Sequence, residues 1–247
     1  MSQLQKLPEK RRKSMPSSKQ VVEEALSKLG QNLSNQRFVR SNFDRLLRKL
    51  FEKTLHVLEE HEQRVDIQIL QEIFNPQKGR GRLQIKPDLY RLLRDYFLSV
   101  SQSRKQRGGK DFELQVQTLL EKAGVPFVCQ PKKERVDLIL PNDELWKRDR
   151  ARAVLISIKR TLRERWRQVV DELEQLRCPN TYLWTADERL AKSTVKEIFQ
   201  RKIYLVVWDQ VKKEFGNYRV FSITEFIKRL EEIHIPNFFR EKTPDDS

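Results

Sequence analysis

Apolar residues recur at helical spacing in three segments of the first hundred residues. These segments run from Val21 to Leu29, from about Ser41 to Glu60, and from Pro87 to Ser99. Side chains three or four positions apart share one helix face, so each segment predicts an amphipathic helix. Between the last two, NPQKGRGRLQIKP is a basic, glycine-containing loop. The pattern predicts an all-helical subdomain over residues 21–104, followed by a polar linker, SQSRKQRGG.

After Gly109 the pattern changes to alternating helices and strands. A helix, KDFELQVQTLLEKAG, stops at Gly124, a residue type that commonly ends helices. Apolar runs then predict strands at PFVCQ, RVDLILP, RAVLISIKRT, TYLWTA and KIYLVVWD. Helical spacing recurs over 163–176, 193–200 and 224–233. The fold class is therefore α/β, with a central mixed β-sheet flanked by helices over residues 105–240.

The two ends of the chain are polar. Residues 1–20 are basic and rich in Pro and Ser, which predicts a flexible arm, and residues 241–247 form a tail. The start has no apolar segment of the kind found in secretory signals, and no apolar run is long enough to cross a bilayer. Cys129 and Cys178 are isolated thiols, which favours a reducing compartment. We expect a cytoplasmic protein that is not bound to a membrane.

The charge balance is strongly basic, with 50 Lys and Arg against 35 Asp and Glu. A net charge of +15 favours a nucleic-acid partner over the alternative of a merely basic soluble protein. Residues 1–107 hold 23 basic and 12 acidic side chains, whereas residues 108–247 hold 27 and 23. The second half therefore has more carboxylates for chemistry.

The sequence lacks the motifs of several other binding and catalytic functions. The 7 glycines include no GxGxxG or GxxxxGK arrangement, so we expect no nucleotide cofactor. His56 and His61 fall on different helix faces and His234 is remote, which argues against a zinc site. Neither GxSxG nor a paired Cys/His arrangement indicates a covalent nucleophile.

Four residues stand out as candidates for chemistry: Glu113, Asp137, Lys159 and Glu172. A carboxylate within an apolar strand is costly unless it is paired or binds a metal, and Asp137 is such a residue. Adjacent strands could set Asp137 beside Lys159. Carboxylate oxygens bind Mg²⁺, and a nearby lysine can orient a metal-bound water, which suits phosphodiester hydrolysis. For Asp137 and Lys159 alone, an ordinary buried ion pair is the competing interpretation.

This arrangement resembles the PD-(D/E)XK nuclease superfamily, and more closely its EcoRII-type group of type II restriction endonucleases. The resemblance spans roughly residues 105–235 and is carried by GGKDFELQVQTLLEKAGVPF, RVDLILP and SIKRTLRERWRQV. It implies a restriction-endonuclease-like fold and Mg²⁺-dependent cleavage of double-stranded DNA at a short palindrome with a CCGG or CCNGG-like core. A homodimer is the expected assembly, with a tetramer as the alternative. The helical segment then serves DNA binding or dimerisation.

Two positions depart from the superfamily pattern. Ser157 replaces the acid two places before Lys159, and Val136 replaces the proline before Asp137. Serine cannot supply an anionic ligand. In the EcoRII-type group a glutamate from the following helix takes that place, and Glu172 is the matching position here, with Asp171 as the alternative. The resemblance thus implies that Asp137, Glu172 and Glu113 hold the metal and that Lys159 positions the water.

A basic-acidic-basic tripeptide, Arg163, Glu164 and Arg165, follows the lysine. Arginine can donate two hydrogen bonds to guanine and glutamate can accept one from cytosine, so the tripeptide can read G·C pairs. The resemblance implies the same role, whereas a solvated helix end is the alternative. The basic stretches RRK around Arg11 and KGRGR at residues 78–82 are expected to contact phosphates.

Two further functions remain open. One is a repair or recombination nuclease of the same fold that selects DNA structure rather than sequence, against which the tripeptide argues. The other is a catalytically inactive DNA-binding module, for which Ser157 is the best support.

Overall fold

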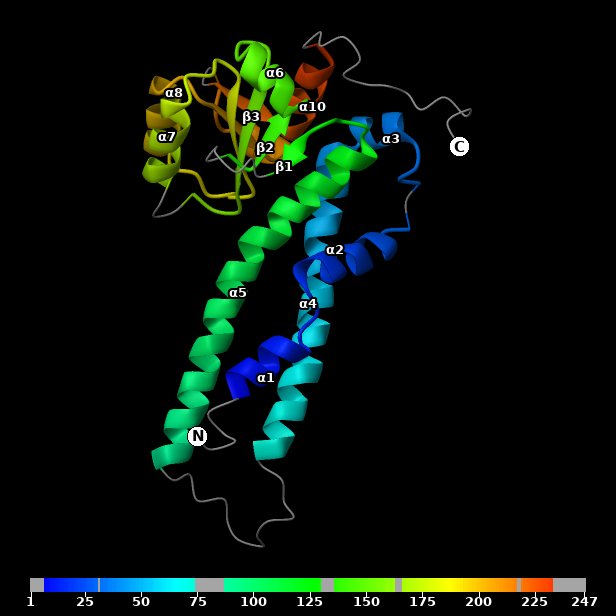
Figure 1. The fold of residues 1–247 in the computed structure, drawn as a ribbon, viewed down its shortest axis with the longest axis vertical. Coiled ribbons are helices and arrows are strands. Elements are labelled where there is room, and N and C mark those ends of the chain that lie inside the picture. The colour runs from blue at the N-terminus through cyan, green and yellow to red at the C-terminus, as the bar shows by residue number, and fades with distance from the viewer. Residues whose placement is uncertain are drawn as a thin grey trace, which may run out of the picture. The chain divides into compact units, whose positions relative to one another are not determined.

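The computed structural model describes residues 7–30, 32–73, 87–129, 136–162, 166–216 and 219–232 (Figure 1). The chain divides into two compact units, the first made of residues 1–30 and 50–111 and the second of residues 31–49 and 112–247. Within the described ranges, no helix combines the length and apolar character needed to cross a membrane.

The first unit is helical. It contains α1 (Leu7–Ser14), α2 (Ser18–Ser27), most of α4 (Phe43–Ile73) and the first part of α5 (Pro87–Lys122). Ser17 caps α2: its hydroxyl accepts from the Gln20 backbone N–H, and the Gln20 side chain accepts from the Ser17 N–H at 2.8 Å. Such reciprocal capping fixes where the helix begins. Apolar residues from α1, α2, α4 and α5 form the core, among them Leu7, Val21, Val65, Ile69 and Val100.

Residues 7–14, predicted to belong to a flexible arm, instead form helix α1. Leu7 and Arg11 on this helix are buried. Arg11 is buried because carboxylates of α4, Glu62 and Asp66, accept its hydrogen bonds at 3.0 and 2.7 Å. A polar segment can therefore pack when its charge meets partners far away in the sequence. Arg11, expected to contact phosphate, is occupied by these carboxylates.

Helix α5 also differs from the prediction. The expected helix end at Ser99 and the linker SQSRKQRGG both lie inside one continuous helix, Pro87–Lys122. Gln, Arg and Lys are good helix formers, and each interior glycine costs only about 1 kcal/mol relative to alanine. Side-chain contacts add support: Arg104 donates to Glu62 at 2.8 Å and Arg107 to the Pro16 carbonyl at 2.7 Å.

The second unit is built on a six-stranded mixed sheet in the order β1-β2-β3-β4-β5-β6. The strands are β1 (Val128–Cys129), β2 (Leu138–Leu140), β3 (Val154–Lys159), β4 (Thr181–Thr185), β5 (Tyr204–Val207) and β6 (Val220–Ser222). The pairs β1–β2 and β2–β3 are antiparallel, and β3 to β6 are parallel. β4 is buried along its whole length, as expected for a strand covered on both faces.

Helices cover both faces of this sheet. The crossovers β3–α7–β4 and β4–α8–β5 join parallel neighbours and are expected to be right-handed, which places α7 (Trp166–Gln175) and α8 (Lys192–Gln200) on one face. They run side by side there (Figure 1). On the other face, Trp184 of β4 packs against Phe43 of α4 and Phe226 of α10 (Ile223–Glu232). The predicted fold class, a mixed sheet flanked by helices with a helical N-terminal part, is confirmed.

Several details went beyond the sequence patterns. α3 (Gln36–Ser41), α6 (Asp143–Arg148), α9 (Asp209–Lys212) and β6 were not predicted, because each is only three to six residues long. The two compact units interleave along the chain, whereas the predicted divisions were consecutive. The predicted tail at 241–247 and the KGRGR loop lie outside the described residues.

Candidate active site

Asp137 and Lys159 lie side by side where β2 begins and β3 ends. β2 and β3 are antiparallel with Leu138 opposite Ile156, and the Asp137 N–H continues the ladder to the Ile156 carbonyl at 3.0 Å. This register brings Lys159 Nζ to 3.0 Å from Asp137 Oδ2. The expected adjacency of the two residues is therefore present, with Asp137 directly before β2 rather than within it.

The two carboxylate oxygens of Asp137 have different surroundings. Oδ2 accepts from Ser157 Oγ at 3.2 Å, from the Ile158 N–H at 2.5 Å and from Lys159 Nζ. No donor from the described part of the chain contacts Oδ1. The side chain of Asp137 is 15% exposed and that of Lys159 is 34% exposed. The carboxylate is thus fixed through one oxygen while the other remains open to a ligand.

The sheet register shows which face this pair occupies. Ile156 and Ile158 stand beside Tyr182 and Trp184 of β4, which face α10. Successive side chains of a strand alternate between faces, so Ser157 and Lys159 point to the face covered by α7 and α8. Asp137 contacts both and lies on that face too.

Helix α7 carries both candidates for the additional acid. Asp171 and Glu174 bind Arg201 at 2.8 and 2.5 Å, and hydrogen bonding to Glu174 holds the pKa of Arg201 above its ordinary value. Arg201 follows α8, so this flank of α7 faces α8. Glu172 lies 100° further round the helix, on the flank away from α8 and therefore toward β2 and β3. Its Oε1 accepts from Gln168 at 3.2 Å. Asp171 is engaged elsewhere, which favours Glu172.

Glu113 comes from the opposite side of the sheet. It is half-buried on α5, next to Phe112, whose ring packs on Trp208 at 6.3 Å. Trp208 follows β5 on the face that carries Tyr204 and Val206, which pair with Tyr182 and Trp184. The contacts of Asp137 and Lys159 do not include Glu113. Among the residues that the structure describes, no three His, Cys, Asp or Glu side chains form a metal-binding group.

The donor set nevertheless fits a magnesium ion that is completed by substrate. Mg²⁺ is usually held by one or two carboxylates together with waters and substrate phosphates rather than by a full protein cage. Asp137 offers a carboxylate oxygen that no described donor contacts, beside Lys159, and Glu172 lies on the flank of α7 away from α8.

The loop after Lys159 is anchored to β4. The Leu162 N–H donates to Asp187 Oδ2 at 3.1 Å, and Thr185 Oγ1 donates to the Arg160 carbonyl at 3.5 Å. Arg163, Glu164 and Arg165 follow directly but lie outside the described residues, and α7 begins at Trp166. Sequence reasoning missed Asp187 and Thr185. Their place directly at the end of β4, the neighbour of β3, was the available signal.

Comparison with known proteins identifies the class of fold. Two structures of metal-depleted Ecl18kI with uncleaved DNA, one of them with modified DNA, match with TM-scores of 0.82 and 0.81 at 24% and 22% identity. They cover 94% and 93% of this chain and 85% and 83% of theirs. A complex of restriction endonuclease PspGI with substrate DNA matches with a TM-score of 0.68 at 20% identity, over 91% of this chain and 95% of that one. This chain has a restriction-endonuclease fold.

The sequence comparison is more specific. The family model described as EcoRII C terminal matches residues 68–227, well over half of the chain. The chain belongs to this family. The type II restriction enzyme SsoII from Shigella sonnei is 30% identical over 152 residues, which cover 56% of this chain and 50% of SsoII. The match therefore spans about half the length of that relative.

Proposed function

We propose that this chain is a type II restriction endonuclease that hydrolyses double-stranded DNA at a short palindromic site with a CCGG or CCNGG-like core. The contact between Asp137 and Lys159, at the sheet end where the Arg163–Arg165 segment begins, carries the proposal. Family membership, the likeness to a type II restriction enzyme and the DNA in the Ecl18kI and PspGI structures support it.

Each proposed catalytic residue has a distinct task. Asp137 and Glu172 would hold Mg²⁺, which when bound neutralises charge on the phosphate and lowers the pKa of a bound water. Glu113, which comes from the other side of the sheet, is the more distant third candidate for this role. Lys159 Nζ, fixed by Asp137 Oδ2, orients the water for attack on phosphorus as the bond to the leaving oxygen breaks. Ser157 replaces the usual acid and donates to Asp137 instead, so it helps to hold the carboxylate in place.

Base reading is assigned to Arg163, Glu164 and Arg165. Arginine matches guanine and glutamate matches cytosine in the major groove. The anchored Leu162 on one side and the start of α7 on the other tie both ends of this tripeptide to the sheet that carries Lys159. Reading and cleavage would therefore be coupled through β3. A palindromic site and one centre per chain favour a homodimer in the cytoplasm, with a tetramer as the alternative.

Digestion of a plasmid of known sequence tests the proposal. Wild-type protein, a Lys159→Ala variant and a reaction containing EDTA are compared with Mg²⁺ present in the first two, and the DNA ends are mapped by sequencing. Discrete ends sharing a CCGG or CCNGG core, absent from both controls, are the expected result. Random or junction-directed cuts would instead indicate a structure-selective nuclease. Tight DNA binding without any cleavage would indicate an inactive binding module.

A further inference from the structure

The starts of four parallel strands lie at the end of the sheet opposite to Lys159. β3 to β6 are parallel, so the loops that lead into Val154, Thr181, Tyr204 and Val220 meet at one edge. Strands are spaced about 4.8 Å apart, so these four starts span about 14 Å. The edge is therefore long enough to contact several consecutive repeats of a polymeric ligand.

Cations gather on these loops. At the end of α6 and in the loop before β3 the chain carries Lys147, Arg148, Arg150 and Arg152 with one acid, Asp149, while Asp143 in the first turn of α6 pairs with Lys147 at 3.6 Å. Arg177 precedes β4, Arg201 and Lys202 precede β5, and Arg219 precedes β6, and all eight basic residues are exposed. We call this set the strand-start surface. At the opposite end, the described segments that follow β3, β4 and β5, residues 160–162, 186–191 and 208–216, hold four basic and four acidic residues. Among the described residues the excess of positive charge is therefore greater at the strand starts.

A pocket of about 580 Å³ lies in this surface between the C-terminal ends of α7 and α8. Leu173 and Ile203 form part of its wall, and Arg177, Arg201, Lys202 and Arg219 line it. Only Glu174 contributes an acid to the lining. The pocket thus gives the cationic surface a recessed centre, which suits an inserted anionic group better than a flat solvated face does.

The cations in the pocket differ in how far they are neutralised. Arg201 is held by Asp171 and Glu174, and Arg219 stacks over the Tyr204 ring at 5.1 Å. No described carboxylate pairs with Arg177 or Lys202. Both follow a helix with φ of 51° and 59°, a conformation at which glycine is the usual residue. Two free cations therefore occupy positions where a helix end requires no charged side chain.

From these observations we infer that the strand-start surface binds the phosphate backbone of duplex DNA outside the recognition site. The inference rests on the proposed function, because it assumes an enzyme that works on DNA. Duplex DNA presents one negative charge about every 1.7 Å along its axis, so an extended row of cations with a recessed centre matches it. Backbone contacts carry no sequence information and serve to hold the enzyme on long DNA.

A triple variant and a matched control test the inference. Arg177→Gln, Lys202→Gln and Arg219→Gln are combined, and the control combines Lys196→Gln, Lys213→Gln and Lys228→Gln, three exposed lysines elsewhere in the same unit. Binding to a long duplex without recognition sites is measured against salt concentration. Each lost phosphate contact lowers the salt slope by about 0.9, so the test variant should lose up to about 2.7 in slope. Its affinity should fall at least about 10-fold below that of the control.

Two further arms separate the explanations. Cleavage of a duplex barely longer than the site should be equal for both variants, because the strand-start surface lies outside that complex. Equal binding of long DNA by both variants would overturn the inference, even if the wild type cuts specifically. If the wild type cuts no DNA and only the test variant loses DNA binding, the inference about the strand-start surface would hold and the proposed function would be rejected. If inorganic phosphate binds the wild-type pocket but the variants bind DNA alike, the site takes free anions and the inference is wrong.

Discussion

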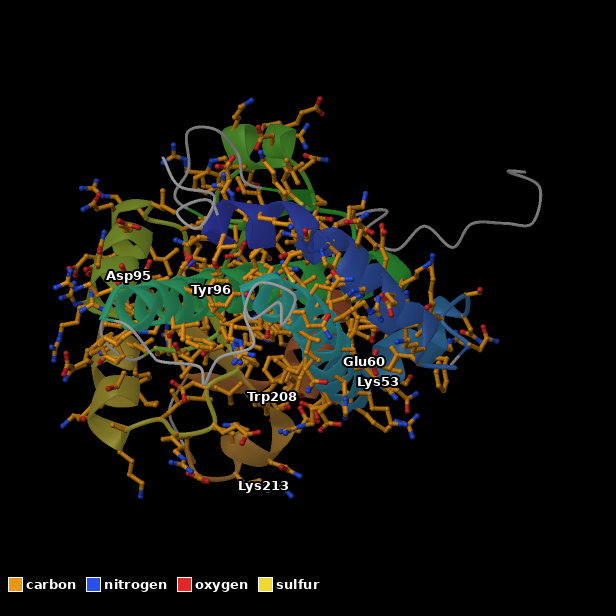
Figure 2. All side chains as sticks on the ribbon, turned by 90° about the horizontal axis from the view of Figure 1, so that it is seen from below. Lys53, Glu60, Asp95, Tyr96, Trp208 and Lys213 are labelled. Carbon is orange, nitrogen blue, oxygen red and sulfur yellow. The ribbon has the colours of Figure 1, made fainter. Side chains whose placement is uncertain are left out.

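The two units handle charge in opposite ways. In the helical unit, Arg11 is buried and its guanidinium is held by Glu62 and Asp66. Tyr96 donates to Asp66 at 2.6 Å and Arg104 to Glu62 at 2.8 Å, which completes a closed network. Tyr96 is buried while its neighbour Asp95 is exposed (Figure 2). In the sheet unit, the Asp137–Lys159 pair is partly exposed, and no donor among the described residues contacts the second carboxylate oxygen of Asp137.

Burial and the hydrogen bonds within the helical network determine the pKa shifts of its members. Burial raises the pKa of Tyr96, and its hydrogen bond to Asp66 adds to the shift. For Arg11, burial opposes the charge, but the hydrogen bonds that it donates to Asp66 and Glu62 outweigh this effect and raise the pKa. A network whose members satisfy one another binds nothing further and serves stability. An open pair retains binding capacity for chemistry, and the predictions below test this distinction.

The largest effect is expected for Lys159→Ala. Loss of a positioned catalytic group costs up to about 10⁴-fold in rate, whereas stability should change little because Ser157 and the Ile158 N–H still hold Asp137. Single-turnover cleavage and thermal unfolding are measured together. Lys159→Arg is the control, since it keeps the ion pair without the amine. Full activity in Lys159→Arg would mean that the residue supplies only charge.

Arg11→Ala should show the reverse pattern. Removing one partner of a buried ion pair typically costs 3 to 5 kcal/mol, because the other partner stays buried without compensation, so we expect about 3 kcal/mol here. The cleavage rate of folded protein should stay the same. Hydrogen exchange of α4 and α5 amides reports the loss. Arg12→Ala, the exposed neighbour, should change stability by under about 0.5 kcal/mol, and equal behaviour of the two variants would contradict a closed network.

Asp187→Ala should affect selectivity more than stability. Asp187 holds the Leu162 N–H directly before the proposed base-reading tripeptide. A hydrogen bond to a charged group contributes about 1.5 to 3 kcal/mol, so discrimination between the site and a one-base variant should fall at least about 10-fold. Asp187→Asn keeps an acceptor and should restore part of it. Glu188→Ala breaks only an exposed pair with Arg48 and should leave selectivity unchanged.

The sequence was informative where the chain alternates buried strands with helices. β3 and β4 are buried almost along their whole length and lie within mostly apolar runs, so their positions followed from the apolar pattern. An isolated carboxylate beside such a strand led directly to Asp137, and the contact with Lys159 followed from strand adjacency. These features depend on local pattern, which a single sequence displays.

The remaining features depend on distant partners. Arg11 looks like a solvated arginine until Glu62 and Asp66, 51 and 55 positions away, are placed beside it. The continuity of α5 through Gly108 and Gly109 similarly depends on contacts from Arg104 and Arg107. Asp187 accepts a hydrogen bond from the main-chain N–H of Leu162, and the side chain of Leu162 gives no sign of this contact in the sequence. Each of these features involves a contact between residues that lie apart in the sequence, which the local pattern does not display.

Two glycines allow a matched test of how local conformation and distant contacts affect stability. A Cβ at Gly109 would meet no atom within 4 Å, whereas Gly124 has φ of +73° and a Cβ there would clash with the Gln36 side chain. Gly109→Ala should therefore stabilise α5 by about 0.5 to 1 kcal/mol. Gly124→Ala should destabilise the sheet unit by about 1 kcal/mol or more. Denaturant unfolding of both variants checks the signs, and destabilisation by Gly109→Ala would show that the glycine is needed.

The smallest effect is expected for the ion cluster formed by Glu24, His61 and Lys28. Its charges are paired, as in the helical network, but they are accessible to solvent, as in the Asp137–Lys159 pair. A hydrogen bond from His61, followed by one from Lys28, lowers the pKa of Glu24 to about 2. Because the folded pKa lies below the ordinary value, the contribution to stability is present above about pH 4.5 and is lost as the pH falls toward 2. Glu24→Gln should remove this acid dependence, while Glu23→Gln, whose ion pair with Lys19 is longer at 3.8 Å, should retain it. Unfolding measured from pH 6 to pH 2 distinguishes them, and parallel curves for the two variants would show that solvent screens the cluster completely.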